Sequence, residues 1–169
     1  SRRRMELLIV RHAIACERNV RRWPDDGARP LSPRGVARAR KAAAGMKQLV
    51  RAPGRVLASP LVRARQTAAI LTEVAGWPPA VEVPELAPGV APEALLAALR
   101  RQPGSRVALI GHEPALSRLL AVALPGAAGA GAFRFRKMGA ALLSFAGAAR
   151  PGGARLEWLV PAKLLRAAR

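Results

Sequence analysis

Short runs of apolar residues alternate along the chain with longer segments whose apolar residues recur at helical spacing. The short runs are rich in Val, Leu and Ile and too brief for helices, which is typical of strands buried on both faces. Strands that alternate with helices predict an open α/β sheet covered on both faces, a three-layer α/β/α sandwich. The predicted strands are 7–10, 55–58, 81–83 and 107–110, followed by 141–145 and an edge strand at 154–160.

Proline, serine and glycine mark the expected ends of the helices. Ser32 followed by Pro33 predicts a helix start, because serine caps the first turn and proline suits its first position. Ser59 followed by Pro60 repeats this signal after the second predicted strand. Further helices are expected from Pro92 and from Pro114, with a polar loop at 15–30, a small-residue loop at 125–132 and a terminal turn at 163–169.

Length and composition favour one ordinary globular domain. The chain has 169 residues, of which 51% are hydrophobic and 23% charged. We expect a single domain over residues 5–169, with Met5 as the native start and residues 1–4 a cloning remnant or disordered. The one cysteine, Cys16, excludes an internal disulfide and a Cys-based zinc site. Because the sequence shows neither a signal peptide nor an apolar run of about 18 residues, we expect a cytoplasmic protein without membrane association.

The chain is strongly basic, with a formal net charge of +19. Such a charge attracts polyanions at low salt. The basic residues are spread along the chain, only 4% of residues are aromatic and tyrosine is absent, so platforms for stacking bases are scarce. We therefore interpret most arginines as solvated surface residues and expect only non-specific attraction to polyanions.

Both histidines of the chain directly follow predicted strands. His12 comes after the first strand and His112 after the fourth, and Arg11 precedes His12. Arg63 lies in the first turns of the helix that follows the second strand. In open α/β sheets the ligand site lies beyond the carboxyl ends of the strands, so we expect these four side chains to share one crevice.

Two arginines and two histidines suit the chemistry of phosphoryl transfer. Guanidinium forks match phosphate oxygens, and a neutral imidazole is a competent nucleophile. Phosphoryl transfer otherwise needs positioning and stabilisation of charge, which the same groups provide. Two histidines without a carboxylate cluster make a poor metal site, so we expect neither a metal nor another cofactor. Each residue alone has an ordinary surface or core explanation, and only the joint pattern supports this hypothesis.

Four sequence blocks resemble the histidine phosphatase superfamily, the phosphoglycerate-mutase-like proteins. Residues 8–13 are similar to its Arg-His-Gly signature, with Ala13 in place of the usual glycine. The other blocks follow in the family's order: Pro-Leu-Ser-x-x-Gly at 30–35, Ser-Pro-x-x-Arg-Ala-x-Gln-Thr at 59–67 and Gly-His-x-Pro at 111–114. The short chain resembles the SixA-type phosphohistidine phosphatases within that superfamily.

The resemblance implies a fold and a role for each matching residue. The sheet would be mixed, with one antiparallel strand. His12 would be the nucleophile that becomes phosphorylated, and Arg11 and Arg63 would clamp the phosphoryl group. His112 would bind the phosphoryl oxygens and stabilise charge in the transition state.

Larger members of the family use a carboxylate as general acid for the leaving group. Glu85 is the best-placed counterpart here, although it could equally be an ordinary turn residue before a helix. Asp25, Asp26 and Glu113 are weaker candidates. The P–N bond of phosphohistidine is labile and its imidazole leaves easily, so a weak or absent acid costs less with that substrate than with an ester.

The sequence therefore predicts a metal-independent phosphatase that acts through phospho-His12 on phosphohistidine in a protein, such as a histidine-containing phosphotransfer domain. The interval from Arg63 to His112 leaves no room for an inserted cap, which favours a protein substrate. One alternative is a phosphomonoesterase acting on small phosphorylated metabolites, and another is a non-catalytic polyanion-binding module. Because His12 must be neutral to attack, activity is expected to fall on acidification near about pH 6.5.

Overall fold

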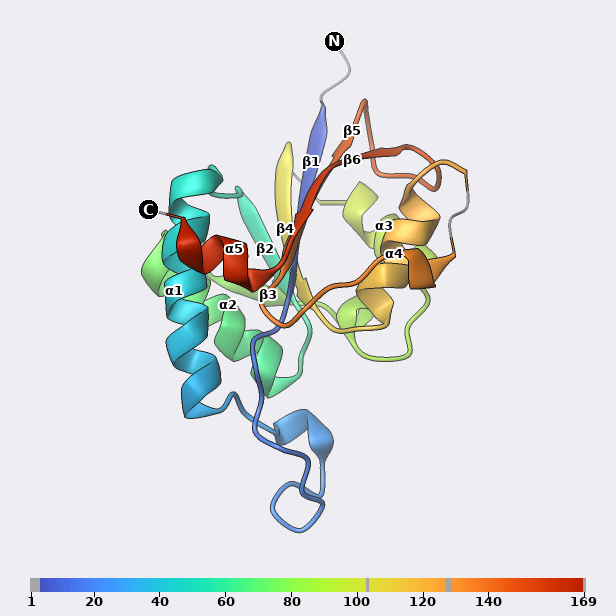
Figure 1. Ribbon diagram of the computed structural model, residues 1–169. Coiled ribbons are helices and arrows are strands. Elements are labelled where there is room, and N and C mark those ends of the chain that lie inside the picture. The colour runs from blue at the N-terminus through green and yellow to red at the C-terminus, as the bar shows by residue number, and fades with distance from the viewer. Residues whose placement is uncertain (1–3, 103, 127–128, 169) are drawn as a thin grey trace.

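A six-stranded sheet runs through the centre of the computed structural model, which describes residues 4–102, 104–126 and 129–168 (Figure 1). The strands lie in the order β3-β2-β4-β1-β5-β6. Their bounds are β1 (Met5–Arg11), β2 (Arg55–Ala58), β3 (Ala80–Glu82), β4 (Arg106–Gly111), β5 (Ala140–Phe145) and β6 (Ala154–Val160).

One strand of this sheet runs against the others. β1 pairs in parallel with β4, and β2 pairs in parallel with both β4 and β3. β5 is antiparallel to both of its neighbours, β1 and β6. The mixed sheet with a single antiparallel strand and an edge strand at β6 is therefore confirmed for the described residues.

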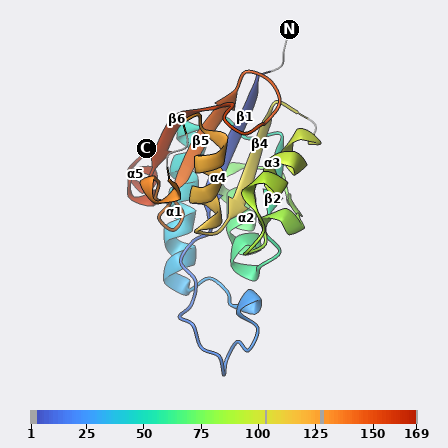
Figure 2. The same ribbon diagram turned by 90° about the vertical axis from the view of Figure 1, so that its right-hand side faces the viewer.

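Helices cover both faces of the sheet, as the alternating pattern predicted (Figures 1 and 2). Alternate residues of β1 feed the two cores: Leu8 and Val10 pack towards one group of helices, and Leu7 and Ile9 towards the other. The first group comprises α1 (Pro33–Leu49), α2 (Val62–Ala75) and α5 (Ala162–Ala167), and the second α3 (Pro92–Arg100) and α4 (Ala115–Ala123).

The start of α1 supports the loop that follows β1. Ser32 caps the helix, because its Oγ accepts a hydrogen bond from Gly35 N at 3.0 Å. A Cβ at residue 35 would collide with the carbonyl oxygen of Ile14, so the loop can pass this closely only over a glycine. The Pro-Leu-Ser-x-x-Gly block thus fixes the path of the chain just after His12.

The element boundaries differ from the sequence predictions by one or two residues: β1 begins at Met5 instead of residue 7, and α2 begins at Val62, two residues after Pro60. β3 covers 80–82 instead of 81–83, and α4 begins after Pro114 instead of at it. The predicted loop at 15–30 contains one short 3-10 helix, Asp26–Ala28. Parts of the predictions for 1–4, 125–132 and the chain end fall on residues 1–3, 127–128 and 169, outside the described residues. Within the described ranges, every helix is too short or too polar to cross a membrane.

Candidate active site

The carboxyl ends of β1 and β4 and the start of α2 border a cavity of about 790 Å³. Arg11, His12, Arg63 and His112 all line this cavity. The structure thus brings together the four side chains that the sequence placed in one crevice. The connection between β1 and α1 forms the outer wall, which includes the short 3-10 helix Asp26–Ala28.

The imidazole of His12 is buried and held in one orientation. Its Nδ1 lies 2.7 Å from the carbonyl oxygen of Ala13, which can only accept a hydrogen bond. Nδ1 therefore carries the proton, and the lone pair lies on Nε2, which makes no hydrogen bond to a described residue. Thr67 Oγ1 accepts a hydrogen bond from Ala13 N at 3.0 Å and so holds the backbone of Ala13, the residue whose carbonyl oxygen orients the ring. This tautomer presents a nucleophilic nitrogen in the cavity.

Burial keeps both imidazoles neutral. Desolvation above all, together with the neighbouring His112, Arg63 and Arg11, lowers the pKa of His12 to about 3, against the opposing effect of its hydrogen bond to Ala13. Desolvation and the two arginines lower the pKa of His112 to about 4. The fall in activity expected near pH 6.5 is therefore displaced to lower pH, because that expectation assumed an exposed histidine.

Because the pKa values of His12 and His112 are lowered, we predict that neither imidazole titrates between pH 5 and pH 8. An imidazole is uncharged above its pKa, so both rings stay neutral from pH 8 down to about pH 5. Nitrogen-detected NMR of the imidazoles provides the measurement, and the chain has only two histidines to assign. The spectra should remain constant over that range. A ring that titrates with a midpoint near pH 6.5 would contradict the lowered pKa values.

A residue at the end of the neighbouring strand β2 holds the ring of His112 in place. Its Nε2 lies 2.6 Å from the Oγ of Ser59, a fully buried residue that follows β2. The ring centroids of His112 and His12 are 5.1 Å apart. His112 Nδ1 is buried and has no hydrogen-bond partner among the described residues. The Ser59 hydroxyl can donate to Nε2, which leaves the proton on Nδ1 for an anion in the cavity.

The two guanidinium groups are anchored and retain free donors. Arg11 Nη1 donates to the carbonyl oxygen of Phe135 at 2.7 Å, and Arg63 donates to the carbonyl oxygen and Oδ2 of Asp26 at 2.9 and 3.2 Å. A guanidinium has five N–H donors, so each retains several for phosphoryl oxygens. Burial lowers the pKa of both Arg11 and Arg63.

Unpaired nitrogens gather at this cavity. Seven buried side-chain polar atoms in the described part of the chain have no hydrogen-bond partner. Three of them are Arg11 Nε, Arg63 Nε and His112 Nδ1. A buried donor without a partner is costly, and three of the four proposed site residues carry one.

Comparisons with known proteins agree with this arrangement. Residues 7–87 match the model of the histidine phosphatase superfamily (branch 1). An uncharacterized protein from Picosynechococcus sp. is 39% identical over 115 residues, which cover 66% of this chain and 68% of that protein. This chain belongs to the histidine phosphatase superfamily.

Within the histidine phosphatase superfamily the structure is SixA-like. A structure of the protein histidine phosphatase SixA complexed with tungstate has a TM-score of 0.81 and 27% identity, and covers 95% of this chain and 99% of that one. A mycobacterial glucosyl-3-phosphoglycerate phosphatase shares the fold, with a TM-score of 0.64 and 21% identity over 92% of this chain and 98% of that one. Membership of this superfamily identifies the chain as a phosphatase. Proteins with this fold include both a phosphatase that acts on a protein and one that acts on a small metabolite.

The structure gives site roles to three motif residues. The sequence predicted no role for Gln66 or Thr67, and it predicted a helix cap at Ser59, which is wrong because Leu61 is the N-cap of α2. Ser59 contacts His112, and Thr67 holds the peptide after His12. Gln66 Oε1 accepts a hydrogen bond from Leu31 N at 2.7 Å and ties α2 to the loop before α1. All three lie in the Ser-Pro-x-x-Arg-Ala-x-Gln-Thr block, so the block itself was the sequence signal that could have identified these supporting residues. It links the loops around the histidine phosphatase site through side-chain hydrogen bonds.

Asp26 and Lys137 also line the cavity. The sequence indicated Asp26 as one of the weaker candidates for the general acid, and it gave no indication of Lys137. A hydrogen bond from Arg29, together with the charges of Arg29, Arg63 and Arg18, lowers the pKa of Asp26. Desolvation and the charges of nearby arginines lower the pKa of Lys137. Asp26 is thus an ionised partner of Arg63, and it is poorly suited to donate a proton.

The structure does not bring Glu85 to the lining of this cavity. Glu85 lies in the 3-10 helix Pro84–Leu86, and its Oε1 is 3.7 Å from Arg101 Nη2. Asp25 and Glu113 do line the cavity. Glu113 accepts hydrogen bonds from the backbone N and Oγ of Ser117. The role of Glu85 as general acid remains a prediction that this geometry does not favour.

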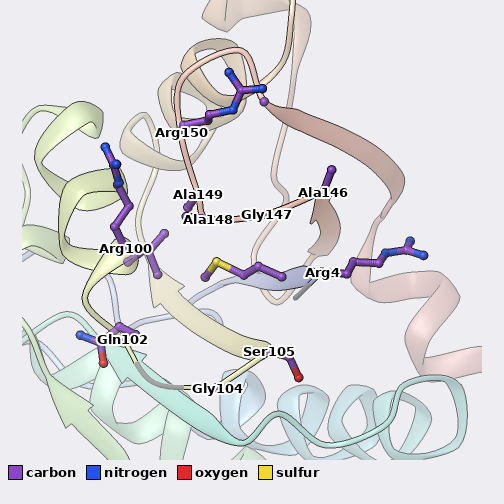
Figure 3. A pocket seen from close by; sticks show the side chains of 13 residues that line it. Arg4, Arg100, Gln102, Gly104, Ser105, Ala146, Gly147, Ala148, Ala149 and Arg150 are labelled. Carbon is purple, nitrogen blue, oxygen red and sulfur yellow. The ribbon is translucent and has the colours of Figure 1, made fainter. Parts of the chain in front are cut away.

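A second hollow lies at the opposite end of the sheet, where β1 and β4 begin. It has a volume of about 560 Å³, and Figure 3 shows Arg4, Arg100 and Arg150 around it with Ser105 below. Neither histidine lines it. Among the described residues, no group of three or more His, Cys, Asp or Glu side chains is placed to hold a metal ion. The cavity with both histidines is therefore the candidate active site.

Proposed function

We propose that this chain removes the phosphoryl group from phosphohistidine in a protein substrate, through a covalent intermediate on His12 and without a metal. The observation that best supports this is the oriented, neutral imidazole of His12 beside the guanidinium groups of Arg11, which is partly buried, and Arg63, which is buried. That arrangement supplies a nucleophile for phosphorus and cations for the phosphoryl oxygens.

The reaction proceeds in two displacements at phosphorus. In the first, the lone pair of His12 Nε2 forms a P–N bond while the P–N bond of the substrate breaks. The substrate imidazole leaves with the electron pair of that bond and takes a proton from water. In the second, a water oxygen attacks phospho-His12, the new P–N bond breaks, and inorganic phosphate leaves. Arg11, Arg63 and His112 hold the phosphoryl oxygens in both steps.

The carboxylates around the cavity favour a substrate with an easily displaced leaving group. Asp26 is held ionised by Arg29 and Arg63, and Glu85 faces Arg101 instead of the cavity. An alkoxide leaving from an ester needs a proton donor, whereas the imidazole of phosphohistidine leaves readily. The site is therefore better matched to a phosphoramidate than to a phosphate ester.

The chain between Arg63 and His112 supports a protein substrate. It consists of α2, β3, a 3-10 helix, α3 and β4, with no inserted segment to close over a small molecule. The similarity to a protein histidine phosphatase SixA at 27% identity points the same way. A phosphorylated side chain on a protein surface can enter such an uncapped cavity.

Phosphate release from two substrates tests the proposal. Hydrolysis of a small aryl phosphate and of a histidine-containing phosphotransfer domain, phosphorylated on its histidine, is measured with a chelator present. The proposal predicts activity with chelator and a higher kcat/KM for the phosphorylated domain. A preference for the small ester would support the metabolite phosphatase instead, and salt-dependent polyanion binding without turnover of either would support a binding module.

A further inference from the structure

A protruding loop beside the cavity carries exposed side chains that the reaction does not use. The connection between β1 and α1 extends beyond the carboxyl end of the sheet in both views (Figures 1 and 2). Residues 18–22 of this connection, here called the tip, include a turn at 20–22, and Val20 is 82% exposed, the largest value among the described large hydrophobic residues. Arg18, Arg21 and Arg22 are exposed on the same segment. One apolar side chain thus lies among three cations.

The tip is ordered by its own hydrogen bonds. Asn19 Oδ1 accepts from the backbone N of both Arg21 and Arg22 at 3.0 Å, and Asn19 O accepts from Trp23 N at 2.8 Å. The Arg22 guanidinium lies over the Trp23 ring, 4.8 Å from its centroid. A surface that is already ordered loses little conformational entropy when a partner binds.

The base of the loop is tied to the phosphoryl clamp. Arg29 is buried and donates to the carbonyl oxygen of Cys16 at 2.7 Å and to Asp26 Oδ1 at 2.8 Å. Asp26 in turn binds Arg63. Arg18 lines the cavity itself, and Val20 is only two residues away, which is at most about 7 Å of chain. A protein whose phosphorylated side chain enters the cavity would therefore lie against this tip.

We infer that residues 18–22 form a docking surface for acidic side chains that flank the phosphorylated histidine of a protein substrate. This inference rests on the proposed function and extends it to the partner. Arg21 and Arg22 complement carboxylates, as does Arg18, which stays 82% exposed although its Nε lies 4.0 Å from Asp26 Oδ1; the exposed Val20 supplies an apolar contact next to them in the chain. Arg22 covers the Trp23 ring, which makes the tip less suited to stacking nucleic-acid bases.

Two synthetic phosphohistidine peptides of equal length test the inference. In one the phosphohistidine is flanked by glutamates, and in the other by serines. The full chain should cleave the glutamate peptide with a kcat/KM about tenfold higher at low salt, a preference that weakens as salt is added. The double variant Arg21→Glu/Arg22→Glu should lose this preference and keep its activity on a small aryl phosphate, because neither side chain lines the cavity.

A charge-matched control separates the loop from the overall charge. Arg100 and Arg150 are exposed beside the hollow at the far end of the sheet (Figure 3). The variant Arg100→Glu/Arg150→Glu changes the net charge equally and should keep the preference. Equal loss in both double variants, or a preference that survives in Arg21→Glu/Arg22→Glu, would overturn the docking surface and leave the proposed function standing. Cleavage of the aryl phosphate but of neither peptide would overturn the proposed function, and the docking surface with it.

Discussion

Replacing His12 by alanine should lower kcat for an aryl phosphate by about 10⁴-fold or more, because it removes the nucleophile. His112 cannot simply take over, since its Nε2 is bound to Ser59 and its ring is fixed in the second position. Steady-state phosphate release measures this effect. Thermal unfolding of the same preparations shows whether the variant is folded.

His12→Asn distinguishes loss of the nucleophile from loss of structure. The asparagine amide can still donate a hydrogen bond to the Ala13 carbonyl oxygen, which His12 Nδ1 contacts in the structure. This variant should keep its melting temperature close to that of the wild type and be as inactive as the alanine variant. Activity of His12→Asn within tenfold of the wild type would mean that another group attacks phosphorus.

Replacing Arg63 by alanine should lower kcat/KM by about 10²–10³-fold, or about 3–4 kcal/mol of transition-state stabilisation. Arg63 lies beneath the cavity wall with its side chain 7% exposed, where water screens its charge poorly. Arg63→Lys should recover only part of the loss, because lysine restores the charge without the planar fork.

Arg65→Ala is the matched control for this prediction. Arg65 lies on the same helix, is half exposed and pairs with Glu82 at 3.4 Å. Its replacement should leave kcat/KM unchanged, because it does not line the cavity. If Arg63→Ala retained full activity while folded, Arg63 would have no part in the site.

The fold could be predicted from local sequence because each element is locally consistent. The apolar run at 7–10 forms the middle of β1, and Ser32 caps α1 as its position suggested. The convergence of His12 and His112 followed from a general rule for parallel strands, since β1 and β4 pair directly. Topology thus converts two separate sequence positions into neighbours.

The features of the site that could not be predicted from the sequence depend on contacts between segments that are distant in the chain. The ion pair between Arg63 and Asp26 joins residues 37 positions apart, through a loop with no periodic pattern. The low pKa values of the two histidines arise from burial and from neighbouring arginines, which no motif encodes. Glu85 follows β3 and is the best-placed candidate acid in the sequence, yet its carboxylate lies 3.7 Å from Arg101 at the end of α3 and outside the lining of the cavity.

The most direct test of the central claim is to trap the phosphorylated enzyme during turnover. Wild type is mixed with a phosphohistidine-bearing protein, quenched with base within one turnover, and examined by mass spectrometry of its peptides. A covalent mechanism on His12 predicts one acid-labile phosphoryl group on His12 in the wild type and none in His12→Asn. A phosphoryl group on another residue, or release of phosphate at the wild-type rate by His12→Asn, would contradict the covalent mechanism.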